Sequence, residues 1–113
     1  MTESRHLSIH INRTADEVYD FTSQLANLPL WAAGVSADMV IEFAARNEFG
    51  VLDHWATVDG MRFYNPMRVI VDDSGCEVVF TLRRAPGVED AAFAADATTI
   101  EADLATLKRI LEN

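Results

Sequence analysis

One apolar stripe runs along the C-terminal part of the chain, and it constrains the fold more than any other feature. Its members recur at alternating intervals of four and three residues: Phe93, Ala97, Ile100, Leu104, Leu107 and Leu111. This spacing predicts a helix over residues 89–112 with one apolar face. Acidic residues near its start and Lys108-Arg109 near its end suit the helix dipole. Such a helix needs a second element with an apolar face against which it can bury its stripe.

The preceding sequence supplies that second element as β-strands. Apolar and polar residues alternate from Leu7 to Ile11, which is typical of a strand with one buried face. Four further runs of strand-forming residues occupy positions 39–46, 51–58, 62–71 and 76–84. Turn sequences join neighbouring runs at 58–61 and 72–75, which indicates antiparallel hairpins. We therefore expect a curved antiparallel sheet of about five strands packed on the long helix.

A pair of short helices is expected after the first strand. Thr14-Ala-Asp-Glu17 is a capping box, in which the threonine hydroxyl accepts a backbone N–H at the start of a helix. Phe21 lies on the apolar stripe of that helix, and LPLWAAG at 28–34 indicates a second helical turn. The order strand, helix pair, strand meander and long helix predicts the α+β class. The length predicts one domain over residues 1–113.

Several segments carry a resemblance to a known superfamily. The opening HLSIHINRTADEVYDFTSQLANLPLWAAGV and the later segments NEFGVLDH, NPMRV and EVVFTLRRAPG resemble the START-related (SRPBCC) helix-grip superfamily. That superfamily includes polyketide cyclases and dehydratases and lipid carriers. The resemblance implies a cavity between the sheet and the last helix that takes a small hydrophobic molecule, with no metal or nucleotide cofactor. The chain is shorter than the superfamily pattern by about one hairpin, between residues 35 and 39.

Composition and charge exclude several classes of partner. Eighteen acidic residues against nine Lys and Arg give a net charge of −9, which argues against binding to nucleic acid or to an anionic membrane surface. The acidic residues of the last helix are expected to form a solvated face. No apolar run approaches the roughly 20 residues of a membrane-spanning helix. With a single cysteine the chain cannot form an internal disulfide, and we expect a cytoplasmic location. His6 and His10 lack further ligands, so no metal site is expected.

The dipeptide Asp53-His54 raises the question of a catalytic pair. Successive side chains of a strand point to opposite faces, so Asp53 cannot orient His54. Alternation predicts that His54 faces inward and that Asp53 faces outward, where it would pair with Arg68 or Arg83. Two interpretations of His54 remain open. It is either a core histidine held by a backbone carbonyl or water, or the polar anchor of a ligand pocket, with general acid–base catalysis as a special case.

The candidate ligand site combines the inward-facing residues of the sheet with residues of the helices. Its predicted members are Phe21, Trp31, Phe43, His54, Phe63, Asn65, Met67, Phe80, Ile100 and Leu104. Three functions remain possible for this site. The first is the binding of a small hydrophobic or aromatic metabolite. The second is a cyclase- or dehydratase-like reaction, with His54 as general acid or base and Asn65 polarising a carbonyl. The third is a non-catalytic interaction module with a collapsed pocket.

The shortened meander also predicts an assembly. Residues 39–46 should form an edge strand, which presents unpaired backbone groups and carries no proline or lysine. A second copy of the chain would cover this edge. We therefore expect a homodimer, with interface residues Met39, Ile41, Phe43 and Trp55.

Overall fold

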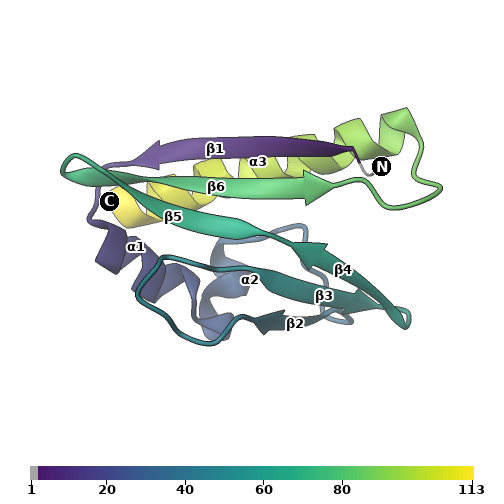
Figure 1. The fold of residues 1–113 in the computed structure, drawn as a ribbon, viewed down its shortest axis with the longest axis horizontal. Helices are drawn as coiled ribbons and strands as arrows, with labels where there is room; N and C mark the ends of the chain where they lie inside the picture. Colours follow the sequence, from purple (N-terminus) through teal and green to yellow (C-terminus); the bar gives the residue numbers. More distant parts are fainter. Residues whose placement is uncertain (1–2) are drawn as a thin grey trace.

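The long C-terminal helix is the element on which the sheet is built. The computed structural model describes residues 3–113. In it, α3 (Asp90–Glu112) packs along β1 (Ser4–Ile11) and β6 (Gly75–Arg83), as Figure 1 shows. The apolar stripe meets the sheet, because Phe93 and Leu107 are at most 2% exposed. The helix begins one residue later than predicted and ends where predicted.

Two antiparallel three-stranded sheets make up the β part of the structure. One sheet has the order β1–β6–β5, with β5 formed by Met67–Asp72. The other has the order β2–β3–β4, formed by Val40–Phe43, His54–Val58 and Met61–Asn65. The fold class is α+β, as predicted. In Figure 1 the β2–β3–β4 sheet diverges from the plane of β1 and β6, so the β surface as a whole is bent.

The prediction of one strand over residues 62–71 was wrong, because Pro66 divides it. Proline has no N–H and a fixed φ, so it interrupts a ladder of hydrogen bonds. The Pro66 carbonyl still accepts a hydrogen bond from the Thr81 N–H at 2.9 Å. The chain therefore bends at this residue without leaving β6, and the first half of the predicted strand becomes β4 and the second half β5.

The segment ahead of β3 joins the two sheets. The Leu52 N–H donates to the Met67 carbonyl at 2.8 Å, and the Val69 N–H donates to the Gly50 carbonyl at 2.9 Å. Strand β3 itself starts only at His54, although a strand was expected from residue 51. Gly50 has a φ of +73°, and a Cβ there would lie 2.3 Å from the Val69 carbonyl oxygen, so this close approach requires glycine.

Short helices follow β1, with α1 against β5 and β6 and α2 against α3. Helix α1 (Ala15–Thr22) begins at the predicted cap, where the Glu17 N–H donates to the Thr14 hydroxyl at 3.2 Å. A 3₁₀ turn, η1 (Leu25–Asn27), leads into the four-residue α2 (Leu28–Trp31). No helix within residues 3–113 combines the length and the apolar character that crossing a membrane would require.

The core is solid near α1 and hollow near α2. Side chains at most 1% exposed fill the solid end: Ile11, Val18, Leu52, Met67, Val78, Cys76 and Leu107. On the β4 side of Pro66, the β2–β3–β4 sheet stands away from α3, and the interior widens into a cavity. In the part of the chain that the structure describes, strand β2 pairs only with β3, so the edge position predicted for it is confirmed, although the strand is shorter than residues 39–46.

Candidate ligand cavity

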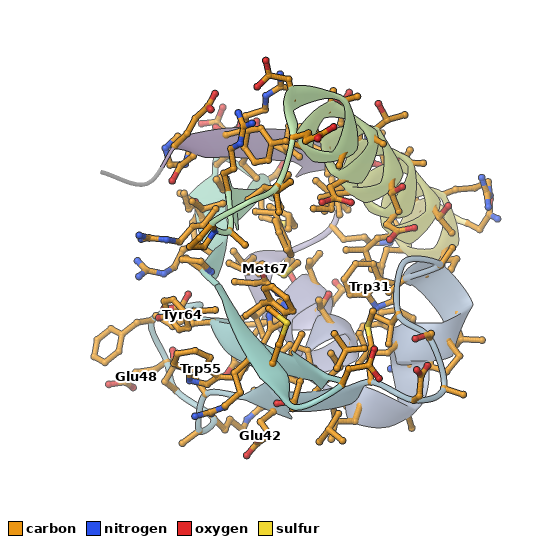
Figure 2. The ribbon with its side chains drawn as sticks, turned by 90° about the vertical axis from the view of Figure 1, so that its right-hand side faces the viewer. Trp31, Glu42, Glu48, Trp55, Tyr64 and Met67 are labelled. Carbon is orange, nitrogen blue, oxygen red and sulfur yellow. The ribbon has the colours of Figure 1, made fainter. Side chains whose placement is uncertain are left out.

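A cavity of about 550 Å³ lies between the β2–β3–β4 sheet, the end of β6, α2 and α3. This volume is within the usual range for small-molecule sites. Eight of the ten predicted site residues line it: Trp31, Phe43, His54, Phe63, Asn65, Phe80, Ile100 and Leu104. In Figure 2 the Trp31 side chain lies between the α2 segment and α3. The third hypothesis assumed a collapsed pocket, and an open space beside His54 is contrary to it.

Two predicted site residues lie elsewhere. Met67 is 1% exposed and belongs to the solid core, because it follows the break at Pro66. Phe21 lies on α1 and packs against the core from that helix. Neither residue lines the cavity. Phe21 is kept from it because α1 covers the β1–β6–β5 sheet rather than the end where the two sheets diverge.

His54 lines the cavity, and only one of its two ring nitrogens has a hydrogen-bond partner within residues 3–113. Its Nδ1 lies 3.0 Å from the Leu52 carbonyl oxygen, which can only accept, so the proton is on Nδ1 and Nε2 carries a lone pair. The ring packs edge-on against Phe43 at 5.2 Å and tilted against Phe80 at 5.8 Å, which fixes its orientation. No residue within the described part of the chain donates a hydrogen bond to Nε2.

Burial sets the charge state of His54. The residue is 9% exposed, and this burial lowers the pKa of the imidazole below its usual value. The Leu52 carbonyl and the charge of Asp53 act in the opposite direction but do not reverse the shift. The ring is therefore neutral at neutral pH, and the cavity wall presents an acceptor rather than a cation.

Asp53 does not assist His54, as the alternation predicted. Its carboxylate accepts hydrogen bonds from the Tyr64 hydroxyl at 2.6 Å and the Met67 N–H at 2.8 Å, and the Arg68 Nε lies 3.6 Å away. Burial raises the pKa of Asp53, but these hydrogen bonds and the Arg68 charge lower it below its usual value overall. The predicted pairing with Arg68 is confirmed, but Asp53 does not lie at an exposed position, because its side chain is only 13% exposed and accepts the backbone N–H beside Pro66.

The predicted interface residues divide between the two faces of the β2–β3–β4 sheet. Met39, Ile41 and Phe43 line the cavity. Trp55 lies on the opposite face, where its ring centroid is 4.9 Å from that of Tyr64. Figure 2 shows Trp55 and Tyr64 together on the side of the sheet away from the cavity.

A buried carboxylate that sequence reasoning missed holds the helical side of the cavity. Asp103 was assigned to a solvated helix face, but it is 8% exposed and lines the cavity. It accepts hydrogen bonds from the Ala33 and Gly34 N–H groups at 3.0 and 3.3 Å. Burial raises the pKa of Asp103 even though both hydrogen bonds lower it. These bonds attach the segment after α2 to α3 and so hold the helical wall of the cavity together.

Residues 3–113 contain no cluster of three or more His, Cys, Asp or Glu side chains that could hold a metal ion. The two histidines of β1 have separate partners. The His6 ring contacts the Thr81 hydroxyl at 2.9 Å, and the His10 ring contacts the Asp72 carboxylate at 3.2 Å. They do not converge on a common point.

Comparisons with known proteins find likeness in structure rather than in sequence. No family model and no curated protein matches the chain. An uncharacterised protein from Bacillus thuringiensis matches with a TM-score of 0.78 at 12% identity, over 98% of this chain and all of the other. DynU16, from the dynemicin biosynthetic locus, matches with a TM-score of 0.78 at 14% identity. That match covers 97% of this chain and 47% of DynU16.

The ZhuI aromatase/cyclase from Streptomyces sp. R1128 also matches, with a TM-score of 0.58 and 13% identity over 99% of this chain and 94% of the other. At these identities the matches establish architecture only. The common features are the antiparallel sheet and the long C-terminal helix that it surrounds. The protein therefore has the helix-grip fold of these structures, as its sequence predicts.

Proposed function

We propose that the protein binds a small hydrophobic or aromatic metabolite in the cavity between the β2–β3–β4 sheet and α3. The observation that carries this proposal is the cavity itself, about 550 Å³ in volume and walled mainly by aromatic and aliphatic side chains. Apolar walls with a few placed polar groups are typical of small-molecule sites. Cyclase-like structure neighbours support the same type of ligand, although they share only the fold.

Filling the cavity should abolish binding. Ala56 lines the cavity, and Thr57 is the next residue of the same strand, with its side chain on the other face. Titration with the neutral fluorophore N-phenyl-1-naphthylamine should give a saturable 1:1 fluorescence increase in the wild type. Ala56→Phe should weaken binding by about tenfold or more, equivalent to roughly 1.4 kcal/mol or more. Thr57→Phe, the matched control, should bind like the wild type. Equal affinities in all three proteins would place the fluorophore elsewhere and refute the proposal.

A second candidate function is a cyclase- or dehydratase-like reaction. The specific observation is the His54 Nε2, which carries a lone pair on the cavity wall beside Asn65, its direct partner across β3 and β4. Such a group can accept a proton from a bound substrate, and an amide N–H can polarise a carbonyl. Because burial lowers the pKa of His54, it would serve as a general base that stays unprotonated below the usual histidine range.

The lowered pKa of His54 has a consequence for stability. Unfolded histidine titrates near about pH 6.5, so below that pH the unfolded state gains a proton that the folded ring resists. The contribution of His54 to the free energy of unfolding should therefore be complete above about pH 6.5 and decline as pH falls through the lower folded pKa. Urea denaturation at several values from about pH 7.5 to about pH 5 should show it. The free energy of unfolding of the wild type, minus that of His54→Leu, should fall on acidification. A value that rises on acidification would mean that the folded pKa of His54 is raised.

We further propose that the protein is a homodimer whose interface includes the β2 edge. Within residues 3–113, strand β2 has a neighbour only in β3, and its outward-facing Val40 is 58% exposed. Leu30 on α2 is equally exposed, and Trp55 is 37% exposed on the outer face beside β2. Unprotected edges of this kind are paired or covered in soluble proteins.

A lysine on the β2 edge should separate the dimer. Val40→Lys changes an outward-facing residue and leaves the cavity wall unaltered. Ile70→Lys is the matched control, because Ile70 is a 50% exposed residue on β5, away from β2. Light scattering at micromolar concentration should give a dimer mass for the wild type and the control, and a monomer mass for Val40→Lys. A soluble wild-type monomer would contradict this assembly without affecting the ligand proposal.

A further inference from the structure

Two polar side chains lie next to each other on the cavity wall with unused hydrogen-bonding capacity. His54 and Asn65 are directly paired in the register of β3 and β4, and both line the cavity. Directly opposed residues of an antiparallel pair have Cβ atoms about 4.5–5.5 Å apart. Within residues 3–113 the structure gives neither His54 Nε2 nor the Asn65 amide a hydrogen-bond partner. The nearby cavity wall is aromatic, with Phe43, Phe63 and Phe80.

The two groups differ in what they require from a ligand. The Leu52 carbonyl fixes the His54 proton on Nδ1, so Nε2 can only accept. The Asn65 amide can donate through its NH₂ group and accept through its oxygen. A hydroxyl on the ligand can donate to His54 Nε2, and a ligand carbonyl a few ångströms away can accept from the Asn65 NH₂ group. A purely apolar ligand would leave both unpaired once it displaced water, which costs free energy.

Several other polar side chains on the cavity wall are already engaged with protein partners. Asp103 accepts two backbone N–H groups. Arg84 contacts the carboxylates of Glu3 and Asp90 at 2.9 and 2.7 Å. Thr99 donates to the Ala95 carbonyl at 3.2 Å. The buried Trp31 indole N–H, which also lines the cavity, has no partner within residues 3–113. On the sheet side of the cavity, the unused polar groups that lie side by side are those of His54 and Asn65.

We propose that the His54–Asn65 pair determines the specificity of this cavity for hydroxylated cyclic carbonyl compounds. The ligand hydroxyl donates to His54 Nε2, and the ligand carbonyl accepts from the Asn65 amide. This inference rests on the proposed function, because it specifies which small apolar molecules the same cavity selects. It also assigns His54 a recognition role that does not depend on any turnover.

Four bicyclic probes of nearly equal size separate the two contacts. 7-Hydroxy-1-tetralone carries both groups without an internal hydrogen bond, because its hydroxyl is meta to the ketone-bearing carbon. 7-Methyl-1-tetralone replaces the hydroxyl with a methyl group of similar size. 5,6,7,8-Tetrahydro-2-naphthol keeps the hydroxyl and lacks the ketone, and tetralin lacks both. Dissociation constants follow from chemical-shift titration of ¹⁵N-labelled protein, which also locates the probe.

Hydroxy-tetralone should bind tightest, with about fivefold lost for each missing hydrogen bond. In His54→Leu, 7-hydroxy-1-tetralone and 7-methyl-1-tetralone should bind alike. The tighter binding of 7-hydroxy-1-tetralone relative to 5,6,7,8-tetrahydro-2-naphthol, which lacks the ketone, should persist. In Asn65→Leu the preference for the ketone should disappear and that for the hydroxyl persist. His6→Leu, a histidine substitution on the outer face of β1, should keep both preferences. The wild-type series decides the matter even if a cavity variant does not fold.

The outcomes separate this inference from the proposed function. If tetralin and the three polar probes bind the wild type equally, the cavity takes apolar ligands but the specificity assigned to the pair is wrong. If the preferences survive in His54→Leu and Asn65→Leu, other residues provide them and the inference is likewise overturned. If none of the four probes shifts any cavity resonance, both the inference and the proposed function fail.

Discussion

The break in hydrogen bonding at Pro66 is the constraint on which the rest of the structure depends. A strand that continued unbroken from β4 into β5 would keep both sheets in one plane and close the interior against α3. Proline removes the N–H at that position, and the adjacent Met67 N–H bonds to the Asp53 carboxylate. The Leu52 N–H and the Met67 carbonyl then join the two sheets across the bend. The sheet is therefore bent but continuous, and it encloses space on its concave side.

The same bend places the polar groups of the cavity. Because β4 ends at Asn65, the last pair of the β3–β4 ladder is His54 with Asn65, at the inner end of the hollow region. Asp53 provides the carboxylate that binds the Met67 N–H at the bend, and Leu52 provides the carbonyl that orients the His54 imidazole. Three consecutive residues, Leu52, Asp53 and His54, thus serve the junction, the bend and the site respectively. On the far side Asp103 anchors the segment after α2, which keeps the opposite wall in place.

Much of this architecture follows from local rules in the sequence. The apolar spacing of α3 and the inward parity of His54 each depend on one dominant signal. The Asp59-Gly60 turn is a further case, because positive φ angles of 51° and 76° are those that the Asp-Gly pair adopts readily. The bend at Pro66 was less visible, because the alternation of Phe63, Asn65, Met67 and Val69 continues through it with the same inward parity. Periodicity therefore indicated one strand where backbone chemistry makes two.

The cavity wall was predicted less well than the fold for a physical reason. Parity assigns a side chain to a face, but it does not say how far along that face the core is filled. Met67 has the inward parity of Asn65 and yet belongs to the solid core, and Phe21 lies on the helix that covers that core. Asp103 was misassigned because an acidic residue within an acidic helix gives no sign that two backbone N–H groups will meet it. Such tertiary contacts decide the site and leave no local pattern.

The tautomer of His54 tests the central claim most directly, because the cavity can select a donor only if Nε2 carries a lone pair. Long-range ¹H–¹⁵N correlation spectra of the histidine rings at about pH 7.5, where an ordinary histidine is neutral, distinguish the two nitrogens. The structure predicts a protonated Nδ1 and an unprotonated Nε2 for His54, with the Nε2 resonance moving when 7-hydroxy-1-tetralone is added. A charged ring, or a proton on Nε2 with Nδ1 free, would contradict the account.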